Sequence, residues 1–111
     1  MVQPEKLEIG ERAEGADLVL SVEGELDLST IPRLAQHIDG RIGSVGASLL
    51  LDLSGVTFMD SSGLRLLIEL HHRAQREGWK LSLTAPAHEA AQLVLRITGA
   101  DAALPFTEGP R

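Results

Sequence analysis

The sequence of 111 residues contains no cysteine, which excludes a disulfide framework and thiolate zinc sites. Aromatic residues make up only 3% of the chain, so aliphatic side chains must fill the core. No apolar run is long enough to span a bilayer, and the N-terminal MVQPEKLEIGER lacks the basic start and apolar centre of a signal peptide. These absences predict a soluble, cytoplasmic protein without membrane insertion.

Positive charge is also scarce. Sixteen acidic residues stand against ten Lys and Arg, giving a formal charge of −6. Nucleic acid is a polyanion, and the sequence shows no local basic patch, because Arg73 and Arg76 are interleaved with Glu69 and Glu77. We therefore expect no direct nucleic-acid partner. The four histidines are not spaced as metal ligands, so neither a metal nor another cofactor is predicted.

The hydrophobic pattern alternates between strands and helices. Short alternating or apolar runs predict strands, and apolar residues at helical spacing predict helices between them. We expect Ser29 or Thr30 to cap the first helix, and we expect the last helix to turn Ala90, Leu93, Val94 and Ile97 inward. The predicted strands are KLEI, DLVLSV, SLLLDL, WKLSLT and ALPF, with a turn at AEGA, and the predicted helices follow Thr30, begin at Leu64 and open at Pro86.

The order β-β-α-β-α-β-α-(β) predicts an α/β fold. An N-terminal hairpin would feed repeated βα units, and right-handed crossovers would give a mixed, mostly parallel sheet with α-helices packed on it. The length fits one domain over residues 1–111, with a core at about 7–106 and a tail at 107–111.

The stretch FMDSSGL, residues 58–64, joins the central apolar run to a helix. Asp60 is placed to accept a hydrogen bond from a free helix amide, which would put Ser61 and Ser62 in the first turn with Gly63 leaving them unshielded. From the local pattern alone, a simple cap is the favoured interpretation. Nucleophilic catalysis needs a base that the surroundings do not offer, and a phosphate-binding loop would need more glycines and a lysine. We therefore predict no catalytic residue and no enzyme.

Three segments together carry a family resemblance. GELD (residues 24–27), LLLDLSGVTFMDSSGL (49–64) and LRITGAD (95–101) resemble the STAS domain, and within it the bacterial anti-sigma-factor antagonists, from about Leu7 to Phe106. The resemblance implies a regulator that binds an anti-sigma factor serine/threonine kinase. The kinase would phosphorylate Ser61, the serine directly after the motif aspartate Asp60, and a serine phosphatase would reset the switch.

The resemblance also implies a partner-binding surface. It would comprise Asp27, Asp60, Ser61, Ser62, Gly63 and Leu66. Asp27 matches an acidic residue near the phosphorylated serine, although it could instead join the cap of the first helix. Arg65 and Leu66 stand where relatives often carry small apolar residues, and TEGPR is too short for the further C-terminal helix of many relatives. The alternative function is a STAS scaffold or accessory subunit that binds a protein in a signalling assembly or lipid-transport complex.

Overall fold

In the computed structural model, five strands and four helices follow one another along the described part of the chain. The structure describes residues 6–15, 17–42 and 48–107. Two strands come first, and helices then alternate with strands, except that two helices follow one another before the last strand. The elements are β1 (Leu7–Glu14), β2 (Asp17–Leu26), α1 (Ile31–Arg41), β3 (Ser48–Met59), α2 (Ser61–Glu77), β4 (Lys80–Thr84), α3 (Glu89–Thr98), α4 (Ala100–Ala103) and β5 (Phe106–Thr107).

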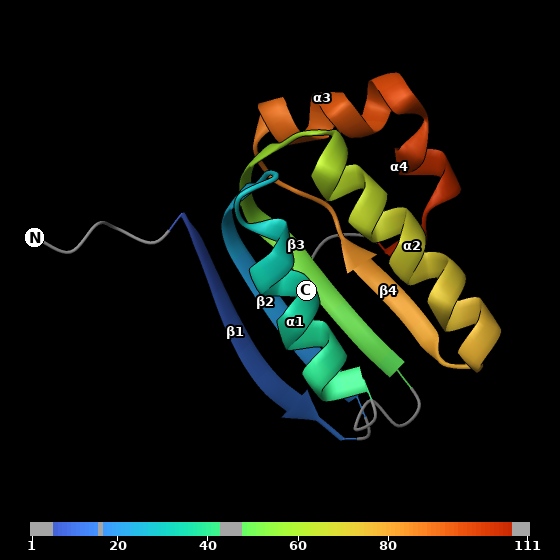
Figure 1. The fold of residues 1–111 in the computed structure, drawn as a ribbon. Coiled ribbons are helices and arrows are strands. Elements are labelled where there is room, and N and C mark those ends of the chain that lie inside the picture. Colours follow the sequence, from blue (N-terminus) through green and yellow to red (C-terminus); the bar gives the residue numbers. More distant parts are fainter. Residues whose placement is uncertain (1–5, 16, 43–47, 108–111) are drawn as a thin grey trace, which may run out of the picture.

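The strands form one mixed sheet in the order β1-β2-β3-β4-β5. β1 pairs antiparallel with β2, and the remaining neighbours pair parallel. Figure 1 shows α1 and α2 side by side in front of this sheet. The predicted fold class, a mostly parallel sheet with an N-terminal hairpin and packed helices, is therefore confirmed.

Leucine dominates the core between the sheet and the helices. Alternate residues of β3, namely Leu49, Leu51 and Leu53, are at most 1% exposed. Leu34 of α1 and Leu67 of α2 are fully buried in the same cluster. Aliphatic side chains thus fill the core, as the low aromatic content requires.

The strands are longer than the sequence predicts. β1 runs on from KLEI through Glu14, so the first two residues of the expected turn AEGA belong to the strand and Gly15 lies in a turn. Residue 16, the last of AEGA, lies outside the described residues. β3 continues from SLLLDL to Met59. Gly24, which lies beyond the predicted strand DLVLSV, falls within β2 with φ at 115°. A Cβ atom there would stand 2.1 Å from the carbonyl oxygen of Lys6, so the close approach of the chain at the start of β1 requires glycine.

The expected caps are only partly right. Thr30 occupies the N-cap position of α1, but neither its hydroxyl nor that of Ser29 makes a capping hydrogen bond. The carboxylate of Asp27 accepts from the amides of both residues instead. α2 begins at Ser61, one turn before the apolar pattern starts at Leu64, because Asp60 supplies a cap there.

The inward face predicted for the last long helix is wrong. α3 begins at Glu89 rather than at Pro86, and it buries Ala91 and Leu95. Leu93 and Ile97 are 44% and 74% exposed. The reason is that α3 packs against β3 and buries the stripe that carries Ala91 and Leu95 rather than the stripe of Leu93 and Ile97. The short helix α4 was not predicted, and β5 covers only the end of ALPF.

Candidate functional site

The fold brings GELD and MDSSGL together at one edge of the sheet. β2 and β3 run parallel, and Leu26 at the end of β2 pairs with Met59 at the end of β3. Beyond that pair, the amide of Asp60 donates a 3.1 Å hydrogen bond to the carbonyl oxygen of Leu26. Asp27 and Asp60 are the residues that follow these two strand ends. In open α/β sheets this carboxyl edge is where binding groups gather.

Asp60 is the N-cap of α2. Its Oδ1 accepts hydrogen bonds from the amides of Ser62 at 2.8 Å and Gly63 at 3.4 Å. Ser61 is the first residue of the helix and is exposed, whereas Ser62 is half-buried. The Ser61 side chain makes no hydrogen bond within the described residues, so its hydroxyl is open to a docking protein. The predicted cap is confirmed, and it presents one of the two serines more openly than the other.

Gly63 has a packing role that the sequence interpretation missed. It is buried, and a Cβ atom there would lie 2.9 Å from Met59 Cγ, 3.0 Å from Leu26 Cβ and 3.1 Å from Leu26 O. The first turn of α2 therefore rests directly on the ends of β2 and β3. Glycine permits this approach, which fixes where the Ser61 hydroxyl sits relative to both strand ends.

Asp27 ties the turn between β2 and α1 together. Its Oδ1 accepts from the amide and the hydroxyl of Ser29 at 2.9 Å and 2.6 Å and from the amide of Thr30 at 3.2 Å. Its Oδ2 pairs with Lys6 Nζ at 2.9 Å. The Ser29 hydroxyl, and after it Lys6, holds the pKa of the Asp27 carboxyl well below its usual range, and the same ion pair raises the pKa of Lys6. Asp27 is thus a charged structural cap at the same edge of the sheet as Ser61. Its ion-pair partner Lys6 could not be inferred from the GELD motif alone.

Two exposed apolar side chains accompany these groups. Leu28, directly after Asp27, is 77% exposed, and Phe58, two residues before Asp60, is 43% exposed. Leu28 lies two residues beyond the end of β2, and Phe58 is the last residue but one of β3, so both stand at the carboxyl ends of the strands that carry the site. Large apolar side chains exposed beside functional groups are typical anchors of a protein interface. Leu28 could have been found in the sequence as an apolar residue outside every predicted stripe.

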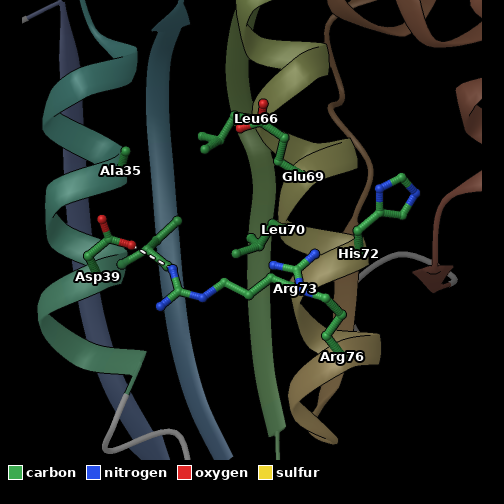
Figure 2. A pocket seen from close by; sticks show the side chains of 9 residues that line it. Ala35, Asp39, Leu66, Glu69, Leu70, His72, Arg73 and Arg76 are labelled. Atoms are coloured by element: carbon green, nitrogen blue, oxygen red, sulfur yellow. Dashed lines mark hydrogen bonds and ion pairs between the residues drawn. The ribbon is translucent and has the colours of Figure 1, made fainter.

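Leu66 lies away from the serines, in a groove between α1 and α2. The groove has a volume of about 370 Å³, and Figure 2 shows Leu66 and Leu70 lying along it. Ile38 of α1 lines its other wall. An ion pair of 2.7 Å between Arg73 and Asp39 bridges the two helices (Figure 2). Leu66 is half-buried in this groove, and its predicted contact with a partner stays a prediction.

The remaining chemistry of the described residues is limited. No group of three or more His, Asp or Glu side chains in this part of the chain could hold a metal ion. No base contacts Ser61 among these residues, and activation of a serine nucleophile needs one. None of the helices described is long and apolar enough to cross a membrane.

Comparison with known proteins identifies the family. A family model described as Mlab, STAS domain, matches residues 9–105. The chain belongs to the STAS domain family. An anti-sigma factor antagonist from Mycobacterium paratuberculosis is similar in structure with a TM-score of 0.75 and 26% identity, over 100% of this chain and 92% of that chain.

Two further solved structures share the fold. A putative anti-sigma factor antagonist from Thermotoga maritima gives a TM-score of 0.78 at 18% identity, over 92% of this chain and 86% of that chain. The anti-sigma factor antagonist SpoIIAA in its unphosphorylated form gives 0.74 at 17% identity, over 94% and 90% of the two chains. The resemblance inferred from the three sequence segments is thereby confirmed, and this STAS domain is similar to anti-sigma-factor antagonists over its whole described length.

Proposed function

We propose that this STAS domain is an anti-sigma-factor antagonist that binds an anti-sigma factor with serine kinase activity and loses that partner when Ser61 is phosphorylated. The observation that carries the proposal is the exposed Ser61 at the first position of α2, behind the Asp60 cap. Similarity to an antagonist at 26% identity over the full chain supports the choice of partner. On this proposal the domain binds and is modified, and it catalyses nothing itself.

The modification is a phosphoryl transfer. The Ser61 oxygen attacks the γ-phosphorus of ATP held by the kinase, the Oγ–P bond forms, and the bond to the β-phosphate oxygen breaks. ADP leaves, and the hydroxyl proton passes to a base of the kinase. A phosphatase would reverse the state by transferring the phosphoryl group to water.

Charge then separates the partners while the fold persists. A phosphoserine adds nearly two negative charges, which the amino end of a helix tolerates. The same charges would enter an interface that also contains the carboxylates of Asp27 and Asp60. A charge that enters an interface where the partner offers no counter-charge costs about 2–5 kcal/mol, or roughly a thirty- to several-thousand-fold loss of affinity. The switch therefore acts on binding rather than on stability.

Calorimetric titration against the anti-sigma factor tests the proposal. That partner is first obtained by co-purification from native cells. We expect wild type and Ser61→Ala to bind with similar affinity, Ser61→Asp to bind more weakly, and protein phosphorylated on Ser61 to bind most weakly. Equal affinity of the phosphorylated and unmodified proteins would exclude a charge switch at Ser61.

That outcome would leave a second candidate, a STAS scaffold or accessory subunit that binds its partner without a switch. The description of the matching family model, which names Mlab, favours keeping this candidate. The two functions predict the same binding edge and differ only in the response to phosphate.

A further inference from the structure

One row of α2 carries charges that alternate at four-residue spacing below Ser61. The row consists of Ser61, Arg65, Glu69, Arg73 and Glu77. Arg65 Nε lies 2.9 Å from Glu69 Oε1, and Arg73 Nε lies 3.1 Å from Glu77 Oε2. Residues four apart are neighbours on a helix surface, so each member of this charge row faces the next. Ser61 is its uncharged first position.

The two arginines of the charge row differ in how firmly they are held. Arg73 is shared between Glu77 and Asp39, and its side chain is 29% exposed. The Arg65 side chain is 81% exposed, and Glu69 is its ion-pair partner within the described residues. Exposed pairs of this kind are weak and screened by solvent. Arg65 can therefore exchange its partner at little cost, whereas Arg73 cannot.

We infer that Arg65 is the intramolecular partner of the phosphate on Ser61. On phosphorylation its guanidinium leaves Glu69, turns one helical turn toward the amino end and pairs with the phosphate oxygens. The inference rests on the proposed function, which makes Ser61 the modified residue. A phosphate dianion outcompetes a single carboxylate, because guanidinium and phosphate match in geometry and make charge-assisted hydrogen bonds. Phosphorylation of Ser61 thus places an anion at the uncharged first position of the charge row, next to Arg65.

The change of partner by Arg65, from Glu69 to the phosphate, extends the effect of phosphorylation along α2. Glu69 lines the groove between α1 and α2 together with Leu66, as Figure 2 shows. Once Arg65 turns away, the carboxylate of Glu69 is no longer neutralised at that position. Phosphorylation then changes the charge at two places on one surface: the helix start and the groove two turns below it.

The test uses protein with phosphoserine incorporated at position 61 during translation, so that no kinase is needed. Phosphorus NMR titration gives the second pKa of the phosphate in the wild-type background and in two variants. Arg65→Gln removes the proposed partner. Arg76→Gln is the matched control, because it removes an exposed arginine of the same helix that lies outside the charge row. The acidic groups near the phosphate, Asp60 and Asp27, are the same in all three proteins.

We expect Arg65→Gln to raise the phosphate pKa by about 0.2–0.4 units, the size expected from one pair at four-residue spacing, and Arg76→Gln to leave it unchanged. The Nε–H signal of Arg65 should shift on phosphorylation while that of Arg73 does not. An identical phosphate pKa in wild type and Arg65→Gln, or an equal shift in Arg76→Gln, would overturn the inference.

The inference and the proposed function fail separately. If Arg65 does not sense the phosphate, the affinity of the anti-sigma factor for unmodified and phosphorylated protein still decides the switch. If phosphorylation leaves that affinity unchanged, the NMR result stands as a property of the helix without a regulatory role.

Discussion

The amide of Asp60 donates a 3.1 Å hydrogen bond to the carbonyl oxygen of Leu26. This bond fastens the start of α2 to the end of β2 across the last pair of the β2–β3 ladder. It places the cap, the exposed serine and the Asp27 turn on one edge, although the two segments lie more than thirty residues apart in the sequence. The position of Ser61 thus depends on how closely α2 approaches the sheet.

Gly63 sets that approach, so Gly63→Ala should destabilise the fold. The new methyl group would press on Leu26 and Met59 at about 3 Å, and overpacking of this kind costs about 1–3 kcal/mol. Gly40→Ala in α1 is the matched control, because a Cβ atom there meets nothing within 4 Å. Alanine favours helix by about 0.5–1 kcal/mol, so the control should be neutral or stabilising. Thermal unfolding of both variants decides; equal melting temperatures would show that Gly63 is not a packing requirement.

Asp27→Asn should lower stability at neutral pH, and the loss should shrink in acid. The pKa of the Asp27 carboxyl is depressed in the folded state by the Ser29 hydroxyl and by Lys6. A depressed carboxyl pKa stabilises the fold above the unfolded-state pKa of about 3.9, and this contribution fades as pH falls below that value. The difference between the melting temperatures of wild type and Asp27→Asn should therefore be constant near pH 7 and should narrow progressively as the pH falls from about 4 to 2.5.

Ser29→Ala serves as the companion variant. It removes the hydroxyl that contributes most to the low pKa of the Asp27 carboxyl. The melting temperature of Ser29→Ala should therefore fall less steeply in acid than that of wild type. A constant difference between wild type and Asp27→Asn across the whole pH range would contradict a stabilising charge at Asp27. Phosphorylation of the folded Asp27→Asn protein then reports separately on the predicted role of this residue in the switch.

The cap and the serine at the helix start were predictable because they are local. A polar residue before a helical stripe, at the end of an apolar run, fixes Asp60 and Ser61 from sequence spacing alone. The extent of β1 was not predictable, because its later residues are exposed and polar and only pairing with β2 makes them a strand. The ion pair between Asp27 and Lys6 was likewise not predictable, because Lys6 lies 21 residues away and pairing of β1 with β2 brings it to Asp27.

The orientation of α3 shows a second limit. Ala91 and Leu95 form one apolar stripe at four-residue spacing, and Leu93 and Ile97 form another about half a turn away. Periodicity cannot choose between two such stripes. In the fold, where α3 packs against β3, the stripe of Ala91 and Leu95 is buried, and Leu93 and Ile97 are 44% and 74% exposed. The choice between the two stripes thus depends on tertiary packing, which the helix sequence alone does not contain.

Ser61→Ala should abolish labelling by the kinase, and Ser62→Ala should leave it intact. Ser61 is exposed at the first position of α2, whereas Ser62 is half-buried and its amide is bound by Asp60. The two substitutions are equal in size and adjacent, so each controls for the effect of the other on folding. The measurement is site-resolved mass spectrometry after incubation with kinase and ATP. A phosphate found on Ser62 or on Thr57 would contradict the assignment of the acceptor.

Leu28→Ala should weaken binding of the anti-sigma factor without lowering the stability of the free domain. Leu28 is 77% exposed beside Asp27, so its truncation removes little packing, whereas burial of such an anchor in an interface contributes about 1–2 kcal/mol or more. Ile97→Ala is a closely matched control, because Ile97 is 74% exposed and lies on α3, outside the edge formed by β2, β3 and the start of α2. We expect a five- to thirty-fold loss of affinity, roughly the same free energy expressed as a ratio, for Leu28→Ala and none for Ile97→Ala.

Titration of both variants against one preparation of the partner makes the comparison, with melting temperatures to confirm that both remain folded. Loss of affinity in Ile97→Ala with full binding by Leu28→Ala would move the docking surface from the serine edge to α3, and Ser61 could then act only at a distance.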